Sequence, residues 1–414
     1  MTFVFSHLSF FSYIASMVVQ NHHIEYLISK SEQVLDSQPV FRFKRYLHFH
    51  IDWNKRIIGI KGLPGTGKTT LLLQYLNSIR KSLPENKVVY INLDDLFFSS
   101  FRIKVLISGL YLQGYRVFAF DQVHLYSGWQ DEFMSALEFF SDCQIVFAGS
   151  SLIEFPPISD AIFELLGLSY REFLQSKLGQ DLAFHNLETI IEKQEALIET
   201  LPKGFSPYSH FEEYLSSGYF PALPNIEDDH STYLNRLIRQ TTEIDMATIA
   251  GFDVRNARNM QHLLFLILTS AGKKPNSSDW AEISGIHRNT LPSYYRLLEQ
   301  SGLVHLIFSD VDPSPQQKPE KVIFSHPGFN EIMNFHFHPG FVKQHFALSM
   351  LLKKHKVTVD NTGLFCVDKY IQMELPIPGR RRRVQRDDFT FRVTDKPKKN
   401  EVGALPLWMF GFLY

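Results

Sequence analysis

The feature that most constrains the fold of this chain is a glycine-rich segment at residues 62–69, with the sequence GLPGTGKT. It fits the pattern G-x-x-x-x-G-K-[ST]. An apolar run precedes it at Ile57 to Ile60, and a stretch with helical spacing follows from Lys68 to Arg80. Strand, loop and helix in this order are the context that a phosphate-binding loop requires. The segment therefore predicts an α/β domain with a nucleotide site at this loop.

The residue types in the loop match the groups of a bound nucleoside triphosphate. Glycines allow the backbone N–H groups to turn toward a phosphate, and the N-terminus of the following helix favours negative charge. We expect Lys68 to reach the β- and γ-phosphates and the Thr69 hydroxyl to coordinate Mg²⁺. The predicted cofactors are thus ATP and Mg²⁺, and the predicted cofactor-binding residues are Gly62, Pro64, Gly65, Thr66, Gly67, Lys68, Thr69 and Thr70.

A second acidic position completes the predicted Mg²⁺ site. The apolar run from Val117 to Phe120 ends in Asp121, which we interpret as the Walker B aspartate. Gln122 follows, where a hydrolytic ATPase of this kind usually has Glu. A Gln orients water by hydrogen bonds but cannot accept its proton, and general-base action is worth ~10²- to 10⁴-fold in rate. Gln122 therefore predicts ATP binding with slow hydrolysis, although some GTPases do position water with a Gln.

Two further patterns define the organisation of the chain. Strands that alternate with helices favour a parallel sheet with helices on both faces, and the expected strands are residues 57–60, 88–93, 117–120 and 145–148. Farther along, helices and then a strand follow in the order of a winged helix-turn-helix. These helices are expected at residues 260–269, 279–284 and 289–300, with the strand at 303–308.

We therefore expect an α/β P-loop NTPase with additional domains. An N-terminal extension with a helix from His23 to Leu35 precedes the core, and a helical lid follows the core. A small C-terminal α/β domain contains a helix from Phe341 to Lys354. The expected boundaries are 1–40 for the extension, 41–180 for the ATPase core, 181–256 for the lid, 257–312 for the winged helix and 320–414 for the C-terminal domain.

Several blocks, in order, resemble those of a prokaryotic AAA+ ATPase family whose C-terminal half is a domain of unassigned function. The resemblance implies an ATP-binding AAA+ core, a winged helix and a C-terminal domain similar to restriction-endonuclease-like folds. The last ten residues resemble the ending of one bacterial branch. The blocks are residues 45–47, 51–53, 62–74, 121–124 with Trp129, 149–151, 168–173 and 405–414.

The chain departs from that family at positions that serve hydrolysis. Besides Gln122, Ala148 stands where the family has Thr, so the resemblance leaves Ser150 as the sensor hydroxyl. Relatives carry an arginine between residues 154 and 168, where this chain has Asp160. Such an arginine stabilises charge on the γ-phosphate. All of these departures favour nucleotide binding without efficient hydrolysis.

The C-terminal domain lacks the acidic residues that a metal-dependent nuclease needs. Gln344 and Leu364 stand where relatives have acidic residues, and Glu374 is followed by Leu375 and Pro376 rather than by a strand that carries Lys. We expect a structural or partner-binding domain. Residues 48–50 and 336–338 each place two histidines on one side of an expected extended segment, but they lack further ligands at a spacing recognised for zinc. Asp94 and Asp95, after the second expected strand, are expected to cap the following helix rather than to bind metal.

Affinity for DNA would have to come from local patches, because 42 Lys and Arg against 43 Asp and Glu leave a net charge of −1. Arg288 and Arg296 of the expected winged helix are candidates, and so is the run Arg380 to Arg383. Apolar residues make up most of the helix around Arg296, which fits a protein interface as well. The basic run lies beside Asp387 and Asp388, which favours a solvated charged turn.

The two cysteines suit a reducing cytoplasm.

The segment from Thr2 to Gln20 carries no charge. It lacks the basic residues and cleavage site of a signal peptide and is interrupted by polar residues, so we expect no membrane role. Translation starting at Met17 rather than Met1 is an open alternative.

Together these features predict a cytoplasmic AAA+ nucleotide switch with an unknown protein partner. Its ATPase activity, slow if present, would use Lys68, Asp121, Gln122 and Ser150, with Mg²⁺ held by Thr69 and Asp121. The main alternative is a DNA-binding regulator with ATP as an allosteric ligand. A third is a scaffold that has lost nucleotide binding.

Overall fold

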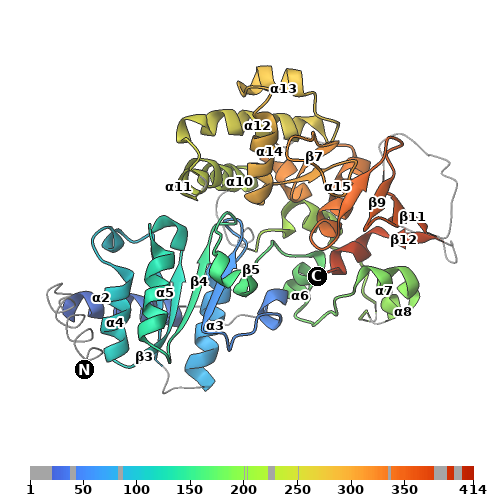
Figure 1. Ribbon diagram of the computed structural model, residues 1–414. Coiled ribbons are helices and arrows are strands. Elements are labelled where there is room, and N and C mark those ends of the chain that lie inside the picture. Colours follow the sequence, from blue (N-terminus) through green and yellow to red (C-terminus); the bar gives the residue numbers. More distant parts are fainter. Residues whose placement is uncertain are drawn as a thin grey trace. The chain divides into compact units, whose positions relative to one another are not determined.

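The computed structural model (Figure 1) describes residues 21–37, 43–82, 87–199, 201–202, 204–221, 229–249, 251–333, 337–376, 389–395 and 403–414. The chain forms two compact units. The first comprises Met1–Lys61 and Lys68–Leu165, and the second comprises Gly62–Gly67 and Leu166–Tyr414. Each unit is described by itself.

The first unit is built on a five-stranded sheet with the strand order β2-β3-β4-β1-β5. All neighbouring strands run parallel, as the alternation of strands and helices predicts. Four strands confirm the predicted ones to within a few residues, whereas the short β5 was not predicted. The strands are β1 Ile57–Lys61, β2 Lys87–Asn92, β3 Tyr115–Asp121, β4 Gln144–Gly149 and β5 Ile162–Glu164.

Helices cover both faces of this sheet. Successive side chains of a strand point to opposite faces, and in these strands the side chains on both faces are apolar. Ile60 and Val146 belong to the cluster that also contains Leu72 of α3. On the other face, the ring of Phe133 in α5 lies 4.8 Å from that of Phe120. The helices of this unit are α2 Asn21–Asp36, α3 Lys68–Ser82, α4 Ile103–Leu112 and α5 Trp129–Phe139, with short 3-10 helices η1 Tyr46–Phe49, η2 Leu96–Ser99, η3 Val123–Leu125 and η4 Pro156–Ala161.

Two local predictions in this unit have different outcomes. The segment His48 to His50 was expected to be extended, but residues 46–49 form the 3-10 helix η1, and His50 Nδ1 lies 3.0 Å from the Tyr46 carbonyl oxygen. The extended interpretation is therefore wrong. Asp95 was expected to cap the helix after the second strand, and it does, because its carboxylate accepts from the Phe97 N–H at 3.0 Å.

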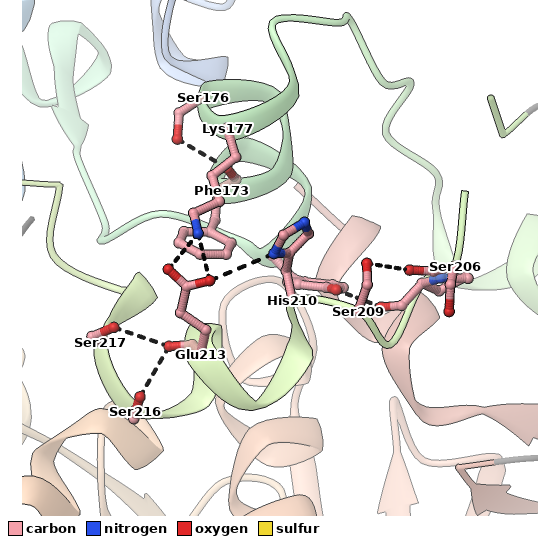
Figure 2. Close-up of polar contacts among 11 residues, drawn as sticks. Phe173, Ser176, Lys177, Ser206, Ser209, His210, Glu213, Ser216 and Ser217 are labelled. Carbon is pink, nitrogen blue, oxygen red and sulfur yellow. Dashed lines mark hydrogen bonds and ion pairs between the residues drawn. The ribbon is translucent and has the colours of Figure 1, made fainter. Parts of the chain in front are cut away.

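The second unit begins with a helix that precedes residues 181–256, the stretch predicted to be helical. Helix α6 Tyr170–Leu178 starts with a capping box, in which Ser169 and Glu172 each accept from the backbone N–H of the other. Figure 2 shows how α6 is joined to α9: Lys177 Nζ lies 2.5 Å from both carboxylate oxygens of Glu213, and His210 Nδ1 lies 3.5 Å from one of them. The helices that follow are α7 Leu187–Glu192, α8 Gln194–Glu199, α9 Phe211–Glu213, the π-helix η5 Tyr214–Gly218, α10 His230–Arg239, the π-helix η7 Gln240–Asp245, α11 Met246–Ile249 and η8 Val254–Asn256.

Three helices and a two-stranded antiparallel sheet come next, in the predicted order. The third helix begins two residues later than expected, at Leu291, with Thr290 rather than Asn289 at the N-cap. The reason is a turn in which the Thr290 N–H and hydroxyl both donate to the His287 carbonyl. The assignment as a winged helix stays a prediction. The elements are α12 Ala257–Ser270, α13 Ser277–Ser284, α14 Leu291–Gln300, β6 Val304–Ile307 and β7 Lys321–Phe324.

The C-terminal part combines helix α15 Pro339–Leu351 with a five-stranded mixed sheet in the order β12-β11-β10-β9-β8. The apolar tail from Ala404 to Tyr414 is buried. Within the described part of the chain, no helix combines the length and apolar character needed to cross a bilayer. The remaining elements are η9 Pro327–Met333, β8 Val357–Val359, β9 Phe365–Val367, β10 Ile371–Glu374, β11 Thr390–Thr394, β12 Ala404–Pro406 and η10 Leu407–Phe412.

Candidate functional site

The glycine-rich loop connects β1 directly to α3, whose first residue is Lys68. Gly65 and Gly67 have φ angles of 79° and 96°, which favour glycine. The Thr66 hydroxyl donates to the Leu63 carbonyl at 2.9 Å and closes the loop on itself. Residues Gly62–Gly67 group with the second unit, whereas Lys68, Thr69 and Thr70 belong to the first.

Within the second unit, the backbone at Gly65 is closely approached by an aromatic side chain. A Cβ atom at this position would lie 1.8 Å from the Tyr233 hydroxyl oxygen and 3.5 Å from Phe220. Only glycine therefore fits here without displacing a neighbour, even apart from its positive φ angle.

Asp121 is the centre of a hydrogen-bond cluster in the first unit. It lies at the end of β3 and is only 2% exposed. Its Oδ2 atom accepts from the hydroxyl of Thr69 and from Tyr90 Oη, the latter at 3.0 Å. Its Oδ1 atom accepts from the Gln122 N–H at 2.9 Å. The two residues predicted to bind Mg²⁺, Thr69 and Asp121, are thus in direct contact, and three donors satisfy the buried carboxylate.

Burial raises the pKa of the Tyr90 phenol, and the nearby charge of Asp121 raises it further. The phenol therefore stays protonated and acts as a donor to Asp121 at every physiological pH. The sequence alone does not single out Tyr90, because an aromatic residue inside an apolar strand is typical of a core. The contact depends on β2 and β3 being neighbours, with Asn92 paired to Asp121 and Tyr90 on the same strand face as Asn92.

The oxygen atoms of Thr69 and Asp121 fit Mg²⁺, which prefers hard oxygen ligands and usually completes its shell with water and substrate phosphates. Among the residues described, no group of three or more His, Cys, Asp or Glu side chains is placed to hold a metal ion. The Walker motifs predict that nucleotide oxygens would supply further ligands.

Gln122 adopts a left-handed backbone conformation, with φ of 56° and ψ of 37°, immediately before η3. Non-glycine residues rarely adopt this conformation, and such positions occur often at functional sites. Ser150, the predicted sensor, follows the end of β4 and is 3% exposed. Because β4 lies between β1 and β3 in the sheet, the carboxyl end of β4 neighbours that of the strand carrying Asp121.

The other residues that the resemblance singles out have defined surroundings in the structure. Asp160 forms an ion pair of 2.6 Å with Lys55, and its side chain is 79% exposed. Ala148 is fully buried within β4. In the C-terminal part, the buried Gln344 donates to the Pro376 carbonyl at 3.1 Å, and Glu374 is the last residue of β10.

Of the residues predicted to contact DNA, Arg296 already forms hydrogen bonds within the chain. Its guanidinium donates to the carbonyls of Ser314 and Pro315, at 2.7 and 3.2 Å. Arg288 is exposed. The run Arg380 to Arg383 lies outside the described residues, as does His336, whereas His338 caps α15 by accepting from the Gly340 N–H.

Comparisons with known proteins agree with this geometry in the first unit. Residues 54–174 match a family model described as an AAA domain, and residues 208–330 match a domain of unknown function, DUF8612. Together with the parallel sheet and the glycine-rich loop, the first match supports a P-loop NTPase fold for this region. The second match extends from α9 to the end of β7 and into η9.

Uncharacterized protein MJ1637 of Methanocaldococcus jannaschii is 24% identical over 277 residues, which are 61% of this chain and 57% of the relative. The chain thus spans little more than half the length of that relative. Solved structures that align include AMPPCP-bound DnaA from Aquifex aeolicus, with 19% identity, 59% and 82% of the two chains and a TM-score of 0.24. PCH-2 from C. elegans aligns with 13% identity, 60% and 62% coverage and a TM-score of 0.25. Similarity at this level does not establish a common arrangement of the whole chain.

Proposed function

We propose that this protein binds ATP with Mg²⁺ and acts as a nucleotide-dependent switch that hydrolyses ATP slowly. The observation that carries the proposal is the contact of the Thr69 hydroxyl with the buried Asp121 carboxylate, at the start of the helix that follows the glycine-rich loop. The AAA-domain match over residues 54–174 supports the same ligand.

Each residue of the proposed site has a separate role in binding the phosphates or Mg²⁺. Lys68 supplies positive charge to the β- and γ-phosphates, and the backbone N–H groups of the loop bind phosphate oxygens. Thr69 and Asp121 hold Mg²⁺, which neutralises charge on the phosphates when it is bound. Tyr90 holds the Asp121 carboxylate in place through its hydrogen bond of 3.0 Å.

Gln122 makes hydrolysis slow, because an amide orients a water molecule but does not accept its proton. The Ser150 hydroxyl is the remaining side chain proposed to orient the γ-phosphate. Asp160 in place of an arginine removes a further source of charge stabilisation. The bound state, rather than rapid turnover, would then carry the signal.

A switch also requires that ATP bind one conformation more tightly than another. We therefore expect limited proteolysis of the full chain to be slowed by ATP with Mg²⁺. A cleavage pattern that ATP leaves unchanged in the wild type would contradict the switch, while leaving nucleotide binding itself intact.

The decisive experiment for hydrolysis is steady-state ATP turnover by the wild type, Gln122→Glu and Lys68→Ala. We expect slow turnover in the wild type, a gain of about 10²- to 10⁴-fold with Gln122→Glu, and none with Lys68→Ala. Gln113→Glu, at an exposed position after α4, introduces the same charge elsewhere and should change nothing. Fast wild-type turnover that Gln122→Glu does not raise would show that Gln122 is not limiting.

The alternative of a DNA-binding regulator is the weaker proposal. Arg296, one of its two expected phosphate contacts in the winged-helix region, donates instead to two carbonyls of the chain. Salt-dependent DNA binding that is lost when Arg288 and Arg296 are substituted would nevertheless favour this alternative.

A further inference from the structure

A cavity of about 400 Å³ lies in the second unit, away from the residues proposed for ATP. It is lined by ten residues, which come from α10, α12, β7 and the end of η9. Neither the nucleotide site nor the expected DNA contacts include any of these residues. We call it the α10–α12 cavity.

Each of the two helices turns one face toward the cavity. Helix α10 contributes Asn235, Ile238 and Arg239, at spacings of three and four residues. Helix α12 contributes four residues at the same kind of spacing, namely Gln261, Leu264, Phe265 and Leu268. Residues three and four apart lie on one side of a helix, so the cavity is a property of how these two helices pack.

The inner wall of the cavity is apolar, and part of its rim is apolar as well. Leu264 and Leu268 are 2% and 4% exposed, and Phe324 from β7 is 3% exposed. By contrast, Phe265 is 46% and Met333 is 37% exposed. Large apolar side chains that stay exposed beside an apolar cavity favour a ligand with an apolar body, because covering them removes their surface from water.

Arg239 is the only charged residue of the lining. It is exposed, and within the described part of the chain it has neither an ion-pair partner nor a hydrogen-bond acceptor. Glu243, four residues farther along the chain, accepts a hydrogen bond of 2.9 Å from the Gln261 amide. The Asn235 amide donates to the Ser231 carbonyl. The guanidinium of Arg239 therefore offers several free N–H donors at a site whose other lining residues, apart from Asn235 and Gln261, are apolar.

We propose that the α10–α12 cavity binds a small apolar anion, a carboxylate carried on an alkyl or aryl body, with Arg239 holding the carboxylate. Small-molecule sites are mostly apolar clefts of ~300 to 1,000 Å³ with few polar groups. A protein partner would instead need roughly 20 to 30 residues on each side, and ten residues line this cavity. The proposal does not depend on ATP binding.

Isothermal titration calorimetry of the full chain with decanoate, and with decanol as the uncharged probe, tests this assignment. We expect decanoate to bind, and Arg239→Gln to weaken it by roughly 10- to 100-fold, as for loss of a charge-assisted hydrogen-bond pair. The matched control is Arg258→Gln, which removes an exposed arginine of α12 that does not line the cavity, and it should bind as the wild type does. Decanol should bind equally to all three.

A second variant locates the binding site independently of charge. Asn235→Trp places a bulky side chain at the exposed rim and should abolish binding of both probes, while circular dichroism shows an unchanged fold. The proposal is overturned if the wild type does not bind decanoate, or if Arg239→Gln binds it as the wild type does. It is also overturned if only an acidic amphipathic peptide binds in an Arg239-dependent way, because the cavity would then dock a protein.

Discussion

Tyr90 and Asp121 lie on neighbouring parallel strands and are joined by a hydrogen bond of 3.0 Å from the phenol to the carboxylate. Both are buried, and the same carboxylate oxygen accepts from Thr69. Tyr90 is thus a positioning residue, because it holds the aspartate that we propose to bind Mg²⁺.

Tyr90→Phe should lower the free energy of unfolding of the first unit. The change removes one of three donors to a buried carboxylate, and a hydrogen bond to a charged group is worth about 1.5 to 3 kcal/mol. It should also raise the Mg²⁺ concentration needed for ATP binding, which a purely structural role would not do. Urea unfolding and Mg²⁺ titrations of ATP binding measure the two effects.

Tyr75→Phe provides the control for this prediction. Its hydroxyl lies 2.6 Å from the Gln144 side-chain oxygen, a neutral acceptor in the same unit. A net loss of about 0.5 to 1.5 kcal/mol is expected, with no change in the Mg²⁺ requirement. A Tyr90→Phe protein with wild-type stability and wild-type Mg²⁺ dependence would show that the hydrogen bond does not position Asp121.

Gly65→Ala should destabilise the chain more than Gly114→Ala. Both glycines have positive φ angles, of 79° and 91°, and an L-residue there costs about 1 to 2 kcal/mol. At Gly65 the new methyl group also collides with the Tyr233 hydroxyl, whereas at Gly114 only the end of the Lys87 side chain is near. Combining Gly65→Ala with Tyr233→Phe should recover part of the loss. Equal thermal shifts for both single variants would contradict the contact with Tyr233.

The second unit should lose stability in mild acid because of its buried histidines. Burial lowers the pKa of His345 to about 4 and places that of His326 well below its usual value. Their Nδ1 and Nε2 atoms, respectively, have no hydrogen-bond partner among the described residues. An unfolded histidine takes up its proton near pH 6.5, so the unfolded chain binds more protons between pH 6.5 and 4. The free energy of unfolding should therefore fall as the pH is lowered from 6.5 to 4, by about 3 kcal/mol for His345 alone.

Urea unfolding at a series of pH values tests this effect. His345→Gln should flatten the pH dependence, because the amide does not titrate. His262→Gln, at an exposed position of α12, should leave it unchanged. The same slope in His345→Gln and in the wild type would exclude His345 as the source.

The sequence allowed the sheet of the first unit to be predicted because apolar runs alternate with helices, and because the loop between Ile57–Lys61 and Lys68–Ser82 has a defined pattern. The strand Ile162–Glu164 escaped prediction, since three residues show no periodicity. Residues 48–50 were predicted wrongly as extended, because their alternation of histidine and aromatic side chains fits a strand as well as the end of a short 3-10 helix.

Prediction of the site was limited for a different reason. Thr69 and Asp121 belong to motifs, but the role of Tyr90 depends on which strands are neighbours, and this is set by the tertiary fold. The α10–α12 cavity is likewise formed by residues that are far apart in the sequence, from Asn235 to Met333. No local pattern marks such a cavity, because its residues are those of ordinary amphipathic helices.

The most direct test of the central claim is equilibrium binding of ATP to the full chain, measured by calorimetry with Mg²⁺ and with EDTA. The account predicts Mg²⁺-dependent binding to the wild type, retained in Lys81→Ala near the exposed end of the same helix and lost in Lys68→Ala. Thr69→Val should bind ATP more weakly and with less dependence on Mg²⁺. Failure of the wild type to bind ATP, or unchanged binding in Lys68→Ala, would contradict the account.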